Sequence, residues 1–198
     1  MVRPRAETYD QKKQEILDGA AEMFAERGFD GASIAAVAAH CGVSKALLYH
    51  YYQSKEALLY HMLLNHCELL SDTVRSAIAG ELEPAERLRC LVRALMSLYL
   101  ASNHKHVVLL NNLHVLPADQ QEEIRSLERE VVGAIKDIVG ELRPDLPSAE
   151  RSALAMNLMG SVNWTYTWFR QGGAITDSRY ADMATAVFLN GIKSDLVF

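Results

Sequence analysis

Residues able to contact DNA gather in one stretch, between Asp30 and Glu56, where no acidic side chain occurs. The polar side chains there include Lys45, Lys55 and the titratable imidazoles of His40 and His50. A surface that meets phosphates should lack acids, because each acid opposes the electrostatic attraction that dominates affinity for DNA. The composition of this stretch therefore favours contact with nucleic acid.

The residues expected to contact DNA divide by position. Lys45, Ala46 and Leu47 would lie in the first turn of a helix, from which side chains reach base edges. Tyrosines further along that helix, with His50 and Lys55, could donate hydrogen bonds to phosphates and fix the register. The full predicted set is Ser33, Ser44, Lys45, Ala46, Leu47, Tyr49, His50, Tyr51 and Lys55.

Two short helices joined by a tight turn would position these side chains. The first has an apolar face, on which Ile34, Val37, Ala38 and Cys41 recur at three- and four-residue spacing. Gly42 is expected to end that helix. Ser44 is a good N-cap for the second, in which Leu48 and Tyr52, four residues apart, would face inward. Two helices joined by a glycine turn form the helix-turn-helix motif, which places its second helix in the major groove of DNA. A helical hairpin inside a larger bundle would have the same pattern of helix, glycine and helix.

The whole run resembles the tetracycline-repressor (TetR) family of bacterial regulators. The matching segments are Ser33-Ile34-Ala35, Cys41-Gly42-Val43-Ser44, Leu48-Tyr49-His50-Tyr51-Tyr52 and Lys55-Glu56-Ala57-Leu58, with Ile16 to Phe24 and Arg27-Gly28-Phe29 upstream. The match covers about residues 12–60, and it departs from the family at Cys41, where alanine is commoner, and at Tyr52, where phenylalanine is.

The resemblance implies an all-α fold of about nine helices in two domains. Residues 1–54 would form a three-helix helix-turn-helix DNA-binding domain, and residues 55–198 a helical ligand-binding and dimerisation domain. It also implies a homodimer that binds a palindromic operator, most often as a repressor, and is released by a small apolar effector. Some relatives respond to acyl- or aryl-coenzyme A thioesters, which makes such a compound a candidate effector here.

Helical periodicity and helix-end residues set the expected elements. The expected helices cover residues 10–27, 55–79, 84–101, a short segment after Asn103, residues 117–140, 148–170 with Ser148 as the cap, and 180–194. The bases Arg3, Arg5, Lys12 and Lys13 suggest a flexible N-terminal arm that could reach DNA. Apolar residues on the last two long helices favour a subunit interface, namely Leu154, Leu158, Val162, Phe169, Ala184, Val187, Phe188 and Ile192.

A second group of residues could bind the effector. Trp164 and Trp168 lie one helical turn apart beside Asn163, and the segment from Asn103 to His114 is rich in histidine and asparagine. These residues could form the wall of a pocket for an apolar body with a polar head. Ordinary core or subunit contacts would explain the tryptophans equally well. The predicted effector set is His66, Tyr99, His106, Asn111, Asn163, Trp164 and Trp168.

Other kinds of site have weaker support. His104, His106 and His114 could ligate a metal, but no cysteine or carboxylate lies at ligand spacing nearby, so no metal site is predicted. Cys41, Cys67 and Cys90 are odd in number and scattered, which suits buried thiols better than a disulfide framework or a redox switch. No catalytic or cofactor-binding signature such as GxGxxG or HExxH occurs, so an enzyme is the weaker alternative and no cofactor is expected.

Composition sets the outer limits. A chain of 198 residues with 49% hydrophobic residues can bury a proper core. Its net charge of −5 does not favour nucleic acid, so the argument for DNA depends on local charge distribution. The N-terminus has no apolar region and no run of eighteen apolar residues follows, which predicts a cytoplasmic protein with no membrane partner.

Overall fold

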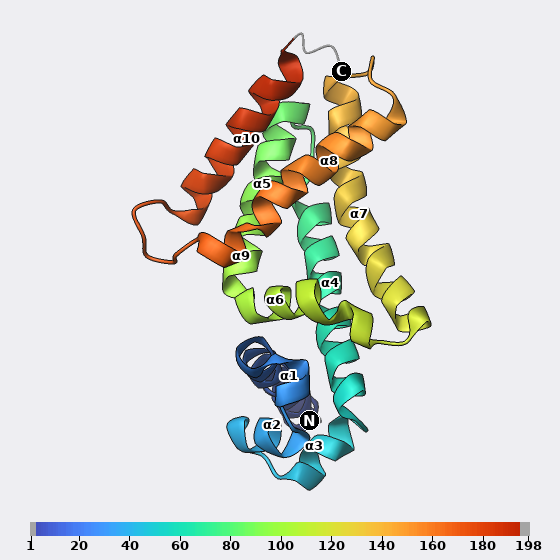
Figure 1. Ribbon diagram of the computed structural model, residues 1–198, viewed down its shortest axis with the longest axis vertical. Helices are drawn as coiled ribbons and strands as arrows, with labels where there is room; N and C mark the ends of the chain where they lie inside the picture. The colour runs from blue at the N-terminus through green and yellow to red at the C-terminus, as the bar shows by residue number, and fades with distance from the viewer. Residues whose placement is uncertain (1–2, 195–198) are drawn as a thin grey trace. The chain divides into compact units, whose positions relative to one another are not determined.

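The computed structural model describes the backbone of residues 3–194 and the side chains of residues 9–194 (Figure 1). This part of the chain is helical and contains no strand, which confirms the all-α prediction. The helices are α1 (Arg3–Gly31), α2 (Ile34–His40), α3 (Lys45–Tyr51), α4 (Lys55–Ala77), α5 (Pro84–Ala101), α6 (Asn103–Asn112), the 3-10 helix η1 (Leu113–Val115), α7 (Ala118–Leu142), α8 (Ser148–Asn163), α9 (Thr165–Trp168) and α10 (Asp177–Lys193).

The chain packs as two compact units, and neither is continuous in sequence. The first consists of Met1–Cys67 and His104–Ile124, and the second of Glu68–Asn103 and Arg125–Phe198. The first unit thus takes in α1 to α3, the first part of α4 and nearly all of α6. The expected division at residues 54 and 55 does not coincide with the boundaries of these packing units, and as a division between functional domains it stays a prediction.

The core of the first unit is built on α1. Its stripe of Ile16, Ala20 and Phe24 is buried, as the periodicity predicts. Gly28 interrupts the helix with a φ of 73°, and the chain then buries Phe29, whose ring centroid lies 5.3 Å from that of Phe24. The glycine therefore ends the regular helix and returns an aromatic plug to the core, as expected.

The N-terminal segment differs from its prediction. The helix α1 begins at Arg3 rather than at Asp10, so the expected flexible arm is helical from Arg3 onward. Side-chain bonds three and four residues apart stabilise the following turns of α1, including Lys12 Nζ to Glu15 at 2.8 Å and Gln14 Nε2 to Asp18 at 3.0 Å.

In the second unit α10 packs against both α5 and α8 (Figure 1). Both helices bury apolar residues, among them Leu91 and Leu95 of α5 and Ile192 of α10. A bidentate ion pair at the surface joins the same helices, because Arg93 Nε and Nη2 donate to the Asp182 carboxylate at 2.7 and 2.8 Å.

Three expectations for the C-terminal helices are wrong. The helix from Ser148 does not continue to Arg170, because α8 ends at Asn163 and only the single turn α9 follows Trp164. The hydroxyls of Thr165 and Thr167 donate to the carbonyls of Val162 and Trp164 at 2.6 and 2.8 Å, and such side-chain bonds compete with the helical ladder. Pro147 rather than Ser148 is the N-cap of α8, and α10 begins at Asp177, capped by Thr176, instead of near residue 180.

None of the helices described is long and apolar enough to cross a membrane.

Candidate nucleic-acid interface and effector site

The turn between α2 and α3 is fixed by backbone hydrogen bonds around Gly42. Ser33 begins α2, its hydroxyl accepting the Ala36 N–H at 3.1 Å. At the other end Gly42 has a φ of 64° and donates to Ala39 O at 3.2 Å, while Val43 N–H donates to Ala38 O at 2.9 Å. This pair of bonds is the Schellman motif, which needs a residue in the left-handed region and so favours glycine. The predicted glycine stop is confirmed.

Ser44 then begins α3. Its hydroxyl accepts the Leu47 N–H at 3.1 Å, which confirms the predicted N-cap. Leu48 and Tyr52 are buried and fix α3 against the first unit, also as predicted. Ser33 and Ser44 therefore have structural roles as caps, and their contacts with DNA stay predictions.

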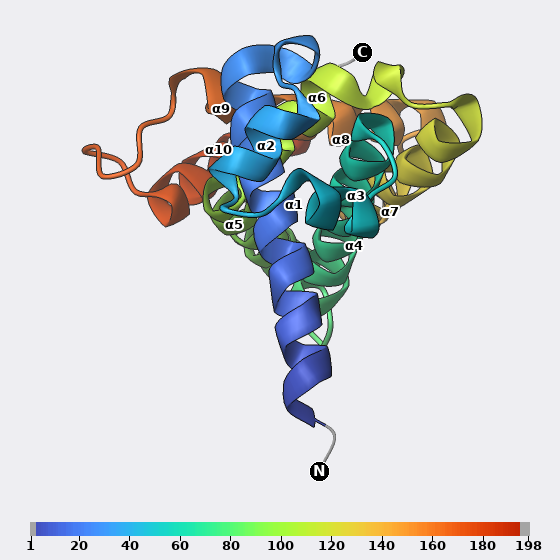
Figure 2. The ribbon, with the colours of Figure 1, turned by 90° about the horizontal axis from the view of Figure 1, so that it is seen from below.

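Figure 2 shows α3 as the short helix that follows α2 and precedes α4. Its side chains other than Leu48 and Tyr51 are exposed. The exposed residues are Lys45, Ala46, Leu47, Tyr49 and His50. Lys45 Nζ lies 5.7 Å from the centroid of the Tyr49 ring, within the range of a cation–π contact. The structure thus brings five of the predicted DNA-contacting residues onto one short helix.

Two other predicted DNA-contacting residues already have partners within the protein. The Tyr51 ring is half-buried, with its centroid 4.9 Å from that of Tyr9. The ammonium of Lys55 donates to Phe29 O at 2.8 Å and lies 4.1 Å from the centroid of the Phe29 ring. Lys55 therefore anchors the start of α4, and only its remaining donors could reach a phosphate.

Close packing of α1 on α2 explains the departure from the family at Cys41. A Cβ atom on Gly19 would lie 2.6 Å from Cys41 Sγ, so the glycine in α1 makes room for the thiol. Burial raises the pKa of the Cys41 thiol, which keeps it protonated and unreactive. A hydrogen bond that the sequence does not indicate joins the same helices, between His40 Nε2 and Glu22 Oε2 at 2.7 Å.

The buried pair of His66 and His106 is the main polar feature of the predicted effector set. Both imidazoles are buried, with His66 Nε2 3.4 Å from His106 Nδ1. Burial lowers the pKa of His66 to about 3, and electrostatic interaction with His106 and Lys105 acts in the same direction. The His66 Nδ1 atom is buried with no hydrogen-bond partner among the described residues. A buried polar atom left without a partner costs about 1–3 kcal/mol, so it is a natural point for a ligand to satisfy.

The helix α6 also carries an ion pair in which the lysine is nearly buried and the aspartate is exposed. Lys105 Nζ lies 2.6 Å from Asp18 Oδ1 of α1, and the lysine side chain is only 11% exposed. Lys105 is the sole lysine or arginine in the histidine- and asparagine-rich segment, but nothing in the sequence identifies its distant partner. Asn111 in the same helix is exposed and donates to Val107 O at 2.8 Å, so it does not join the histidine pair.

The other four predicted effector residues belong to the second unit. Tyr99 is buried, and Asn163 is half-buried, with an Oδ1 atom that has no hydrogen-bond partner in the described part of the chain. Trp164 and Trp168 are 62% and 47% exposed in the protomer. The Trp168 ring rests edge-on against Tyr180, with the centroids 5.2 Å apart.

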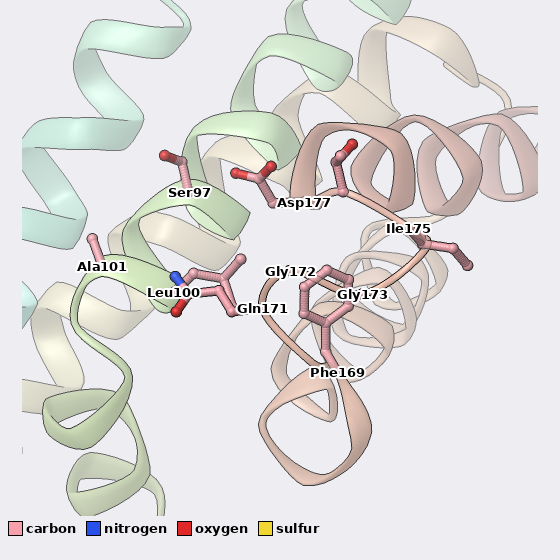
Figure 3. Close-up of a pocket in the computed structure, with 10 residues that line it drawn as sticks. Ser97, Leu100, Ala101, Phe169, Gln171, Gly172, Gly173, Ile175 and Asp177 are labelled. Atoms are coloured by element: carbon pink, nitrogen blue, oxygen red, sulfur yellow. The ribbon is translucent and has the colours of Figure 1, made fainter.

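A cavity of about 340 Å³ in this unit does not involve the tryptophans. Figure 3 shows it between α5 and the segment that leads into α10, with Leu100, Phe169 and Asp177 among its lining residues. Neither Asn163 nor either tryptophan lines it. Their participation in a ligand pocket stays a prediction, and their exposure favours the alternative role in a subunit contact.

The histidines considered as metal ligands are not brought together. His104 and His114 are exposed, whereas His106 is buried against His66. Among the residues described, no three histidine, cysteine or acidic side chains are placed to hold a metal ion.

Comparison with known proteins covers both parts of the chain. Residues 16–62 match the family described as bacterial regulatory proteins, tetR family, and residues 81–192 match the tetracyclin repressor-like C-terminal domain. The HTH-type transcriptional repressor KstR2 of Rhodococcus jostii (strain RHA1) is 27% identical over 193 residues, which span 92% of each chain.

Two solved structures extend this likeness. A TetR-family transcriptional regulator from Bordetella parapertussis 12822 is 34% identical, with a TM-score of 0.86 over 94% of this chain and 97% of its own. AibR, crystallised with isovaleryl coenzyme A and operator DNA, is 26% identical, with a TM-score of 0.77 over 89% of this chain and 97% of its own. With a matched C-terminal domain covering more than half of its length and a helix-turn-helix in the expected place, the chain belongs to the TetR family and is a DNA-binding transcriptional regulator, not an enzyme.

Proposed function

We propose that the protein is a dimeric repressor that binds a palindromic operator through α3 and is released when an acyl or aryl thioester binds beside His66. The exposed, acid-free face of α3 carries the DNA-binding half of this proposal. Its side chains can meet bases without moving, because caps and the buried Leu48 already hold the helix. Two such helices, about 34 Å apart in a dimer, would read successive turns of the major groove.

The unpartnered His66 Nδ1 atom supports the effector-binding half. In one tautomer His106 Nδ1–H donates to His66 Nε2, which places the second proton of the pair on His66 Nδ1. That N–H could donate to a carbonyl oxygen. Because His66 is uncharged when buried and the ammonium of Lys105 is already paired with Asp18, an uncharged acceptor suits this position better than a carboxylate.

A thioester carbonyl is such an acceptor, and the acyl chain beside it is apolar. The relative AibR was crystallised with isovaleryl coenzyme A and operator DNA, which makes that thioester a reasonable first probe. To release DNA the effector must bind one conformation better than the DNA-bound one, and allosteric couplings of this kind are typically ~1–3 kcal/mol.

Exposed apolar side chains support dimerisation through α8 to α10. The most exposed are Met156, Trp164, Trp168, Met183 and Val187. Large exposed apolar side chains gathered on a few helices are typical of interaction sites. Several residues expected at this interface are instead buried in the protomer, namely Leu158, Val162, Phe188 and Ile192. The proposed interface therefore rests on the outward side chains of the same helices.

Selection from random duplex DNA tests the operator half of the proposal. A palindromic sequence should emerge, and its affinity should fall steeply as salt rises, because phosphate contacts release counterions.

Isovaleryl coenzyme A should then weaken operator binding by about tenfold, the mid-range of such couplings. The His66→Phe variant should keep operator binding and lose this response. The control His104→Phe, which changes an exposed histidine of α6, the helix that carries His106, should keep both.

The outcomes separate the parts of the proposal. A selected sequence without two-fold symmetry would contradict the dimeric mode of binding. No response of the wild type to isovaleryl, longer acyl or benzoyl thioesters would eliminate this effector class, and a normal response in His66→Phe would remove His66 as its anchor.

Sedimentation tests the interface. Val187→Glu places a charge at a position that is 74% exposed in the protomer, so it should leave folding intact and convert the dimer to a monomer. Leu82→Glu, at an exposed position between α4 and α5, is the matched control and should remain dimeric. A Val187→Glu protein that sediments as a dimer would show that α10 is not the subunit contact.

A further inference from the structure

The outward face of α3 has two chemically different edges. Successive side chains of a helix are rotated by about 100°, so the buried Leu48 defines the inward direction. Ala46 and His50 then point directly outward. Lys45 and Tyr49 lie on one flank, consistent with the 5.7 Å cation–π contact between them, and Leu47 lies on the other flank.

Leu47 is an apolar side chain on a face that otherwise offers polar groups and one methyl. It is 37% exposed, and its backbone N–H, not its side chain, makes the capping bond to Ser44. Single exposed leucines are common on protein surfaces and need no explanation by themselves. The position of this one is informative, because it lies in the first turn of the helix that enters the groove.

Ala46, the residue before Leu47, makes close approach to DNA possible. It points outward with only a methyl group, so a base edge can come near the helix at this point. Ala46 and Leu47 together form a small apolar edge, with no acceptor or donor to read amino or carbonyl groups. In the major groove the C5 methyl of thymine is the apolar feature that such an edge can read.

We infer that each operator half-site carries a thymine whose C5 methyl packs against Leu47, and that the Lys45 flank faces a guanine. The inference rests on the proposed operator binding and specifies its chemistry. A lysine ammonium is a donor for the O6 and N7 acceptors of guanine, whereas Leu47 can discriminate only by shape and desolvation. Burying one methyl-sized group is equivalent to about a fourfold change in affinity.

Deoxyuridine substitution isolates this contact, since uracil differs from thymine only by the missing methyl. Each thymine of one half-site of the selected operator is replaced in turn, and the dissociation constant is measured at fixed salt. For the wild-type dimer one replacement should weaken binding by about fourfold. The Leu47→Ala variant should bind the thymine and uracil operators equally, and Leu47→Met, which keeps an apolar side chain of similar size, should restore the preference.

Other results would overturn the inference. Equal binding of every uracil operator by the wild type would show that no thymine methyl is read. A methyl preference that persists in Leu47→Ala but disappears in Ala46→Gly would assign the contact to Ala46 instead. Failure of the proposed function looks different, because then no operator would be selected and there would be no thymine to replace. Circular dichroism of each variant checks that α3 still folds.

Discussion

The first unit holds its two sets of recognition groups in opposite ways. The side chains of α3 from Lys45 to His50 are exposed except for Leu48, and the helix that carries them is fixed from behind. His66 and His106 are buried and bonded to each other, and the His66 Nδ1 atom has no hydrogen-bond partner in the described structure.

The difference indicates what each set can select. Exposed groups stay hydrated until DNA arrives, so they can be charged, and the operator is read by charge and by the shape of base edges. A buried imidazole has already lost its water, which disfavours the protonated form. It therefore selects for uncharged partners, and its energetic effects should be larger than those of any group on α3.

The largest effect should come from His66. In the unfolded chain a histidine gains a proton near pH 6.5, whereas burial holds the pKa of His66 at about 3 in the folded state. The contribution of His66 to the unfolding free energy is therefore at its full value above pH 6.5. It is lost as the pH falls toward 3, by at most ~1.4 kcal/mol per pH unit, because the unfolded chain binds a proton that the folded chain does not. Urea unfolding between pH 7 and pH 5 should show a smaller slope for His66→Phe than for the wild type.

His104→Phe is the control for this measurement, because it removes an exposed imidazole from α6, the helix that carries His106. The groups that interact with His66, namely the buried His106 and the half-buried Lys105, remain in both variants. An unchanged slope in His66→Phe would show that the buried pair is not the source of the pH dependence, and the contrast between the two regions would fail.

The next effect should come from the turn that fixes α3. Gly42 has a φ of 64° and no atom within 4 Å of a built Cβ, so Gly42→Ala has space but adopts a strained backbone. We expect a loss of ~1–2 kcal/mol in unfolding free energy, together with weaker operator binding. Gly133→Ala in α7, which also has no atom within 4 Å, should instead leave stability unchanged or raise it by up to ~1 kcal/mol. Equal behaviour of the two variants would mean that the turn does not constrain α3.

A smaller effect should come from the cap of α3. Ser44→Ala removes the acceptor for the Leu47 N–H and should cost ~1 kcal/mol in chemical denaturation. Ser148→Ala is the matched control, because Ser148 is inside the first turn of α8 and provides no cap. A loss at Ser148 as large as that at Ser44 would refute this assignment of caps.

The smallest effect on stability should come from Lys45. Its contact with Tyr49 is exposed, so Lys45→Ala should change the unfolding free energy by only ~0.5 kcal/mol. Operator affinity should fall and the preference at one base position should relax, whereas a residue that contacts only phosphate would weaken all sequences alike. Lys136→Ala in α7 controls for loss of one positive charge. Selection with both variants would show whether Lys45 reads a base.

The helix-turn-helix could be predicted from the sequence almost residue by residue. Ser33, Gly42 and Ser44 each form a hydrogen bond with a backbone group three residues away, as predicted for caps and a glycine stop. The inward position of Leu48 and Tyr52 follows from helical spacing alone. These features depend on residues close together in the chain, so they can be predicted from capping residues and from helical spacing in the sequence.

The contacts of the predicted effector residues could not be derived from the sequence. The pairing of His66 with His106, and of Lys105 with Asp18, joins helices that have no mutual signal in the sequence. The sequence likewise did not indicate that Lys55 donates to Phe29 O, and its contact with a phosphate stays a prediction. The tryptophans give the clearest case, because hydroxyl bonds from Thr165 and Thr167 accompany the end of α8 at Asn163 and both rings then face solvent. Helical spacing assumes a continuous helix, so only the tertiary structure could decide where that helix stops and which way Trp164 and Trp168 point.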